Sequence, residues 1–180
     1  MKKITISKQD TKYLKIIRKN ISHFIMKASK SYDKKKKLLL DIAPQDYEGA
    51  KAFFKKSKIK TLDINSYSKA DYIADICNKN NNIIHDNTFD YILCTEVLEH
   101  TLNPFEAVKE IYRILKPKGI LFISIPFNFR IHGPLPDCWR FTKYGIKTLL
   151  KHFIILKINE IPTKNRNLMP IHYTVIAKKP

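Results

Sequence analysis

Apolar residues recur along the chain at two spacings. Across residues 11–29 they stand three and four positions apart, which predicts an amphipathic helix ahead of the main domain. Seven short apolar runs follow, suited to strands buried on both faces, at 38–42, 59–64, 72–76, 89–95, 120–125, 154–159 and 171–178. Helices are expected at 47–56, 103–115 and 142–151, with a turn at 116–119. The alternation predicts an α/β fold with a mainly parallel, doubly wound sheet.

Length and composition favour one domain with a helical extension. The chain has 180 residues, 44% of them hydrophobic, which is enough for one core and too little for two ordinary domains. We expect residues 1–35 to form the extension and residues 36–180 the main domain. No apolar run approaches the roughly 18 residues that cross a bilayer, and no apolar leader follows the lysine-rich start, so we expect a cytoplasmic protein. The widely spaced Cys77, Cys94 and Cys138 predict no disulfide and no metal site.

The formal net charge of +18 allows two interpretations. Such a charge suits a polyanionic partner such as nucleic acid. However, 29 of the 34 basic residues are lysines, and isoleucine and asparagine are abundant, as AT-rich coding produces. Phosphate sites favour arginine, because its guanidinium can donate two parallel hydrogen bonds. The composition therefore favours coding bias, and a nucleic-acid partner remains the alternative.

Acidic residues stand at the ends of three successive predicted strands, at Asp41, Asp63 and Asp75. Ligands of open parallel sheets bind outside the carboxyl ends of the strands. Carboxylates there can accept hydrogen bonds from ribose hydroxyls and from an exocyclic amine. One such residue alone would suit helix capping or a turn, whereas three at corresponding positions indicate a nucleoside site.

The segment 89–125, which reads FDYILCTEVLEHTLNPFEAVKEIYRILKPKGILFISI, resembles the class I S-adenosylmethionine-dependent methyltransferases. The similarity is to the type 11-like group that includes ubiquinone-biosynthesis enzymes, and with the acidic strand ends it covers about residues 36–160. It implies a Rossmann-like, doubly wound, mainly parallel seven-stranded sheet with an antiparallel last strand. It also implies S-adenosyl-L-methionine as the cofactor of the domain 36–180.

The resemblance implies roles for residues at the adenosine end of the cofactor. Asp63 would bind the ribose hydroxyls, with Ile64 beside the adenine. Asp75 and the backbone of Ile76 would contact the adenine amine.

Further residues would line the methionine end, after the fourth strand. The resemblance places Thr95, Glu96 and His100 there. For Glu99 and His100, an ordinary structural role at the start of a helix is the alternative.

The first loop departs from the family pattern. The family usually carries alternating glycines after the first acidic residue, so that backbone amides can approach the cofactor closely. Here Asp41 is followed by Ile42, Ala43, Pro44 and Gln45; Ala43 is a tolerable substitute, but Pro44 lacks a donor. Either this loop, through Asp41 and Ala43, binds the cofactor in an altered way, or the domain has kept the fold and lost tight binding.

The segment 126–141, PFNFRIHGPLPDCWRF, follows the fifth predicted strand and resembles a subgroup associated with sugar or cell-envelope biosynthesis. His132 is the preferred general base, because its ordinary pKa suits neutral pH, and His100 is the second candidate. Asp137 and Arg140 would orient the acceptor or support the loop. The structural alternative is an Asp137–Arg140 ion pair, with Trp139 in the core and Thr142 as a helix cap.

The leading function is methyl transfer to a small molecule or to a sugar or cell-envelope intermediate. One alternative is a noncatalytic binding module, which the glycine-poor first loop would suit. Another is an RNA methyltransferase, which only the charge suggests, and lysines clustered around the cofactor site with exposed aromatic side chains would support it. No G-x-G-x-x-G follows the first strand, which argues against a nicotinamide dehydrogenase.

Overall fold

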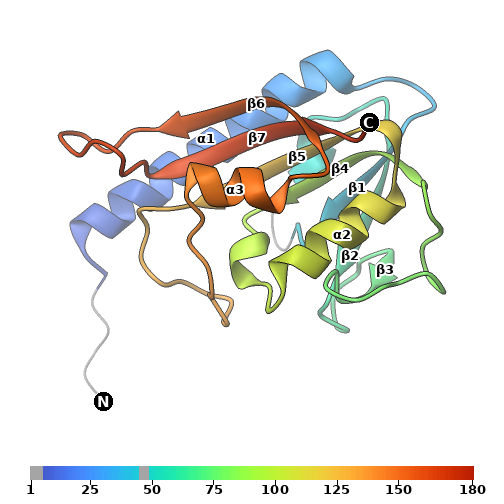
Figure 1. Ribbon diagram of the computed structural model, residues 1–180, viewed down its shortest axis with the longest axis horizontal. Coiled ribbons are helices and arrows are strands. Elements are labelled where there is room, and N and C mark those ends of the chain that lie inside the picture. Colours follow the sequence, from blue (N-terminus) through green and yellow to red (C-terminus); the bar gives the residue numbers. More distant parts are fainter. Residues whose placement is uncertain (1–5, 45–48) are drawn as a thin grey trace.

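The computed structural model describes residues 6–44 and 49–180, and its elements form one seven-stranded sheet with helices on both faces (Figure 1). The helices are α1 (Lys8–Tyr32), α2 (Pro104–Ile114) and α3 (Lys143–Leu149), with short 3-10 helices η1 (Gly49–Ala52) and η2 (Leu98–His100). The strands are β1 (Leu38–Ile42), β2 (Lys58–Asp63), β3 (Tyr72–Ile73), β4 (Phe89–Thr95), β5 (Leu115–Pro126), β6 (Ile154–Ile161) and β7 (His172–Lys178).

The sheet has the strand order β3-β2-β1-β4-β5-β7-β6. Strands β1 to β5 pair in parallel, and β7 runs antiparallel to both β5 and β6. The predicted fold, a doubly wound and mainly parallel seven-stranded sheet with an antiparallel last strand, is therefore confirmed.

Helices cover both faces of the sheet because its central strands are apolar on both sides. Alternate side chains of a strand point to opposite faces. On one face, Leu93 and Phe122 pack with Phe24 and Ile25 of α1. On the other face lies the larger cluster that α2 and α3 cover, and Figure 1 shows these two helices on the side of the sheet opposite α1. The apolar runs of the sequence thus account for a three-layer core.

Each main helix begins at a residue that can cap it. Ser7 and Asp10 form a capping box at the start of α1, Asn103 accepts from the N–H of Glu106 ahead of Pro104, and Thr142 accepts from the N–H of Gly145. The predicted helix starts at 103 and 142 are confirmed, and the first helix extends further in both directions than the predicted 11–29.

The helix predicted at 47–56 is wrong in its described part. Residues 47 and 48 lie outside the described ranges, and only η1 forms after them. The carboxylate of Asp33 accepts hydrogen bonds from the N–H groups of Lys55, Lys56 and Ser57, at 2.7 to 3.1 Å. These N–H groups are bound outside a helix, so the segment turns directly into β2.

Two further boundaries differ from the sequence prediction. The strand predicted at 72–76 ends at Ile73, since the N–H of Cys77 turns back to the carboxylate of Asp75. The predicted turn at 116–119 is part of β5, where Lys118 has a left-handed backbone (φ 64°) and donates its N–H to Lys179 O. Pairing with the C-terminal residues holds this segment in the sheet.

No helix within residues 6–44 and 49–180 is both long enough and apolar enough to span a bilayer.

Candidate functional site: a pocket at the carboxyl ends of the strands

A pocket of about 990 Å³ opens at the carboxyl ends of β1, β2 and β4 and beside the turn after β3. Seven of the eight residues that the sequence assigns to cofactor binding line it: Asp41, Ala43, Asp63, Ile64, Asp75, Ile76 and Glu96. Residues 134–136 from the segment after β5 close another part of the wall. The topology therefore brings the predicted adenosine and methionine ends into one cavity.

Thr95 is the predicted residue that does not line this pocket. It is the last residue of β4, and the chain turns directly after it, where Glu96 adopts a left-handed backbone (φ 54°). That turn presents Glu96, rather than Thr95, to the pocket.

The loop after β1 uses left-handed backbone where the family usually has glycines. Ala43 has φ 49°, a conformation in which a side chain costs about 1 kcal/mol or more. Gly49 has φ 50°, and a Cβ built there would lie 2.2 Å from Asp41 Oδ2. Gly49 is thus a required glycine that the sequence reasoning missed, because it stands beyond the expected motif. Gln45, the other residue questioned there, lies outside the described residues.

Asp41 is buried beside Gly49 and Ala50. Its carboxylate accepts the N–H of Ala50 at 2.7 Å. Burial is the largest influence and raises the pKa of Asp41 to about 7, although the Ala50 N–H and Lys51 act in the opposite direction. The residue is therefore partly protonated near neutral pH and holds the N–H of Ala50.

Asp63 and Asp75 both line the pocket. The Oδ1 atom of Asp63 accepts the N–H of Asn65, and Oδ1 of Asp75 accepts the N–H of Cys77, both at 2.8 Å. Within the described residues, Oδ2 of Asp63 has no hydrogen-bond partner. Each carboxylate is thus fixed through Oδ1, and Oδ2 of Asp63 can accept from a ligand donor.

Glu96 is held by a network that the sequence reasoning did not find. Its Oε1 lies 2.8 Å from Ser124 Oγ and 2.8 Å from Nε2 of His172, which is fully buried. The other ring nitrogen of His172 lies 2.8 Å from the side-chain amide of Asn20 in α1. An Asn amide nitrogen can only donate, so His172 Nδ1 accepts and Nε2–H donates to Glu96. The signal in the sequence was a histidine inside an apolar strand.

The segment after β5 is built around Asp137. Arg140 binds both carboxylate oxygens of Asp137, with Nη2 2.7 Å from Oδ2, and the N–H of His132 donates to the same Oδ2 at 2.9 Å. Burial alone would raise the pKa of Asp137, but the bonds from Arg140 and His132 outweigh it and lower the pKa to about 2. The ion pair predicted as the structural alternative is present, and Thr142 caps α3 as predicted.

Trp139 corrects one detail of that alternative. Its side chain is not in the core: 39% of the residue is exposed, and the ring stacks on Phe141. Its indole N–H donates to Thr101 O, which ties the segment to the end of η2 instead.

Two histidines lie close together beside the pocket. The rings of His100 and His132 lie 4.9 Å apart between centroids, and His100 lines the pocket. His132, Asp137 and Arg140 stand behind this wall and do not line the pocket themselves. Burial is the main influence on His132 and lowers its pKa, so the ring is neutral near pH 7.

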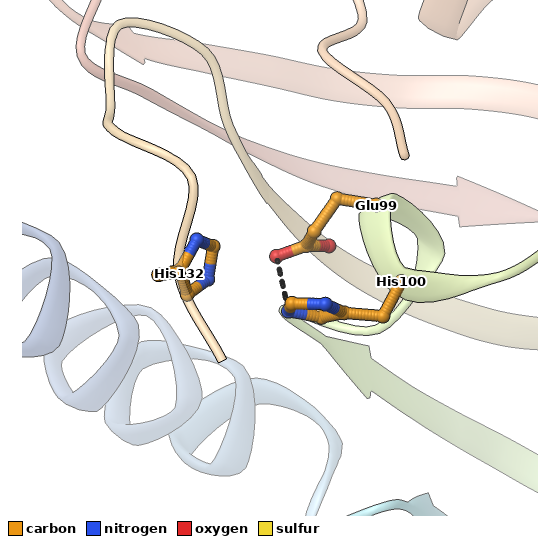
Figure 2. A group of neighbouring side chains, drawn as sticks. All are labelled: Glu99, His100 and His132. Atoms are coloured by element: carbon orange, nitrogen blue, oxygen red, sulfur yellow. Dashed lines mark ion pairs between the residues drawn. The ribbon is translucent and has the colours of Figure 1, made fainter. Parts of the chain in front are cut away.

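Glu99 lies beside the histidine pair, as Figure 2 shows. It is fully buried, and neither carboxylate oxygen has a hydrogen-bond partner among the described residues. Burial raises its pKa well above the ordinary value, and the charge of Glu96 adds to this effect. The Nε2 atom of His100 lies 3.9 Å from Glu99 Oε1.

Comparison with known proteins gives a family match. A family profile described as "Methyltransferase domain" matches residues 24–123. The ubiquinone/menaquinone biosynthesis C-methyltransferase of Rickettsia prowazekii is 30% identical over 90 residues, which are 50% of this chain and 35% of that protein. The ubiquinone biosynthesis O-methyltransferase of Photobacterium profundum is 26% identical over 103 residues, which are 52% of this chain and 44% of that protein. These alignments span less than half of either curated relative.

The fold is shared with solved structures. A SAM-dependent methyltransferase from Archaeoglobus fulgidus superimposes with a TM-score of 0.68 at 18% identity, over 92% of this chain and 94% of that chain. At that identity, the likeness establishes the architecture.

Proposed function

The chain belongs to the class I S-adenosylmethionine-dependent methyltransferases, and we propose that it transfers a methyl group to a small molecule or to a sugar or cell-envelope intermediate. The observation that carries the proposal is the pocket at the strand ends, which collects seven separately predicted cofactor residues. In this proposal, one set of residues binds the cofactor and another positions the acceptor.

The hydrogen-bond acceptors and apolar side chains of the pocket fit S-adenosyl-L-methionine. Asp63 keeps one carboxylate oxygen without a partner in the described structure, as binding ribose hydroxyls requires, and Ile64 beside it is exposed to receive an adenine ring. Asp75 and Ile76, which the resemblance assigns to the adenine amine, and Glu96, which it assigns to the methionine end, line the same pocket. A Cβ at residue 49 would collide with the Asp41 carboxylate, so Gly49 lets the backbone pack closely beside it.

The acceptor would meet the histidine pair. When bound, the cofactor supplies a methyl group on a sulfonium, whose leaving thioether is neutral. The protein therefore has to position an acceptor in line and remove its proton. His132 suits this task, since its Nδ1 lies 3.0 Å from Asp137 Oδ2 and its ring is neutral near pH 7. His100, whose ring lies 4.9 Å from that of His132, lines the pocket, and Arg140 fixes Asp137.

A small acceptor is supported by the relatives and by the distribution of charge. The two curated relatives named above carry ubiquinone or menaquinone biosynthesis in their names. The chain has 34 lysines and arginines. Among the described residues, two of them, Lys51 and Lys69, line the pocket. The lysine clustering that an RNA methyltransferase would need at the cofactor site is not a feature of this wall.

The test is methyl transfer into a fractionated extract of the source organism. We expect tritium from the methyl group of S-adenosylmethionine to enter the small-molecule or the glycan and lipid fraction. His132→Ala should lose this transfer and keep cofactor binding, because the backbone N–H that holds Asp137 remains. His85→Ala, at an exposed position outside the site, is the matched control. Label in the RNA fraction alone would support the RNA alternative, and absence of label from every fraction would support a noncatalytic module.

A further inference from the structure

The feature with no role so far is the buried carboxylate of Glu99. Both of its oxygens lack a hydrogen-bond partner in the described structure, although the residue is completely buried. Buried polar groups are almost always paired, and an unpaired buried carboxylate is especially unfavourable. A bound cation is one of the few groups that would pair with both oxygens.

Two imidazoles stand close enough to share such a cation. Ligand atoms of Glu99, His100 and His132 all lie within 4.8 Å of one another, and Figure 2 shows the three side chains facing a common space from η2 and from the segment after β5. Tetrahedral zinc with ligands at about 2.1 Å separates them by about 3.4 Å. Side-chain movements of about 1 Å would therefore bring the three ligand atoms to the separations of a tetrahedral zinc site.

Each imidazole is already oriented as a metal-bound histidine usually is. His100 Nδ1 lies 2.9 Å from Pro136 O, and His132 Nδ1 lies 3.0 Å from Asp137 Oδ2. If both Nδ1 atoms carry the proton, both Nε2 atoms have the free lone pair. A carboxylate or carbonyl behind a ligating histidine is the usual arrangement that fixes its tautomer and raises its basicity.

We propose that Glu99, His100 and His132 form a binding site for one divalent transition-metal ion of the Zn²⁺ type. Two imidazoles and one carboxylate are a nitrogen-rich set that suits Zn²⁺, Fe²⁺ or Co²⁺ better than Mg²⁺ or Ca²⁺, which take oxygen ligands. Three protein ligands leave a coordination position open, and His100 places the ion at the wall of the pocket. This departs from the expectation of no metal site, which considered only the cysteines.

The ion would also define the acceptor, a step that rests on the proposed function. A hydroxyl bound at the open position loses its proton to solvent water more readily than a free hydroxyl does. Its oxygen then forms the bond to the methyl carbon while the carbon–sulfur bond breaks and the electron pair stays on sulfur. In this arrangement His132 activates the acceptor as a metal ligand rather than as a general base, and the acceptor is an oxygen nucleophile.

The test is cobalt binding to protein that carries no polyhistidine tag and has been stripped with EDTA. Titration with Co²⁺ should give visible absorption bands that saturate at one equivalent and disappear when Zn²⁺ is added. Glu99→Gln and His132→Ala should each weaken binding by tenfold or more, and Asp137→Asn should weaken it through the orientation of His132. His85→Ala should bind like the wild type.

Thermal unfolding with and without Zn²⁺ gives a second measure of metal binding. Zn²⁺ should raise the thermal midpoint of the wild type and of His85→Ala, but not that of Glu99→Gln or His132→Ala. Wild-type protein without cobalt bands, or equal binding by all variants, would overturn the site. The same stripped protein is titrated with S-adenosylmethionine: cofactor binding without metal binding would defeat this inference alone, and metal binding without cofactor binding would defeat the proposed function alone.

Discussion

Burial of the Asp41 carboxylate couples the stability of the folded protein to pH. Burial is the main cause that raises its pKa from 3.8 to about 7, so the folded state keeps a proton that the unfolded chain releases above about pH 4. The contribution of Asp41 to the free energy of unfolding is therefore greatest below pH 4 and falls as the pH rises to about 7. One pKa unit corresponds to about 1.4 kcal/mol, so this loss is at most about 4 kcal/mol.

Asp41→Asn removes that dependence and keeps an oxygen for the Ala50 N–H. Urea unfolding of both proteins between pH 4 and 7 measures the effect. The stability of the wild type relative to the variant should fall across this range. Parallel curves for the two proteins would show that Asp41 is ionised throughout.

Ala43 holds a left-handed backbone conformation that glycine adopts without strain (φ 49°). Ala43→Gly should therefore raise the free energy of unfolding by about 1 kcal/mol. Ala107→Gly in the middle of α2 is the control and should lower it by about 1 kcal/mol or more, since glycine disfavours a helix interior. If Ala43→Gly also lowers the stability, the loop does not store this strain.

At the scale of elements, we propose that residues 1–35 are a helical extension whose helix α1 is built into the core of domain 36–180. Phe24 packs edge-on against Phe122 of β5, with ring centroids 6.2 Å apart, and Ile25 is 3% exposed. Asn20 continues this contact to the pocket through His172 and Glu96.

Ile25→Ala tests this integration. It should lower the free energy of unfolding by about 2–4 kcal/mol, the usual loss when a large buried aliphatic side chain is truncated. Ile6→Ala is the matched control, because Ile6 is 64% exposed and precedes the helix, and its effect should stay within about 0.5 kcal/mol. Chemical denaturation measures both. Equal effects would mean that α1 is not part of the cooperative unit.

The sequence predicts elements well where local pattern and packing agree. The apolar runs of β1, β4 and β5 lie in the core, so their positions follow from periodicity alone. The segment 47–56 fails because the Asp33 carboxylate, distant in sequence, binds the N–H groups at its end. The turn at 116–119 fails because pairing with Lys179 holds it in β5.

The site follows a similar division. The acidic residues at the strand ends could be predicted, because the end of a strand is a local feature that the pattern of one segment shows. Gly49, His172 and the pairing of Glu99 with two histidines depend on contacts between distant segments, which no local pattern records. Long-range contacts therefore account for what the sequence reasoning missed.

At the scale of the whole molecule, the sheet gathers the acidic strand ends and His100 around one cavity. Asp41 of β1, Asp63 of β2 and Asp75 after β3 line this cavity, as does His100, whose ring lies 4.9 Å from that of His132. The account therefore depends on whether the altered first loop still admits the cofactor.

Isothermal titration of the purified chain with S-adenosylmethionine and S-adenosylhomocysteine is the most direct test. We predict one site with micromolar affinity for the wild type. Asp63→Ala should bind about ten- to a hundredfold more weakly, because charge-assisted hydrogen bonds to the ribose are lost. Glu106→Ala, on the exposed face of α2, should bind like the wild type. No binding by the wild type up to millimolar cofactor, or equal binding by Asp63→Ala, would contradict the account.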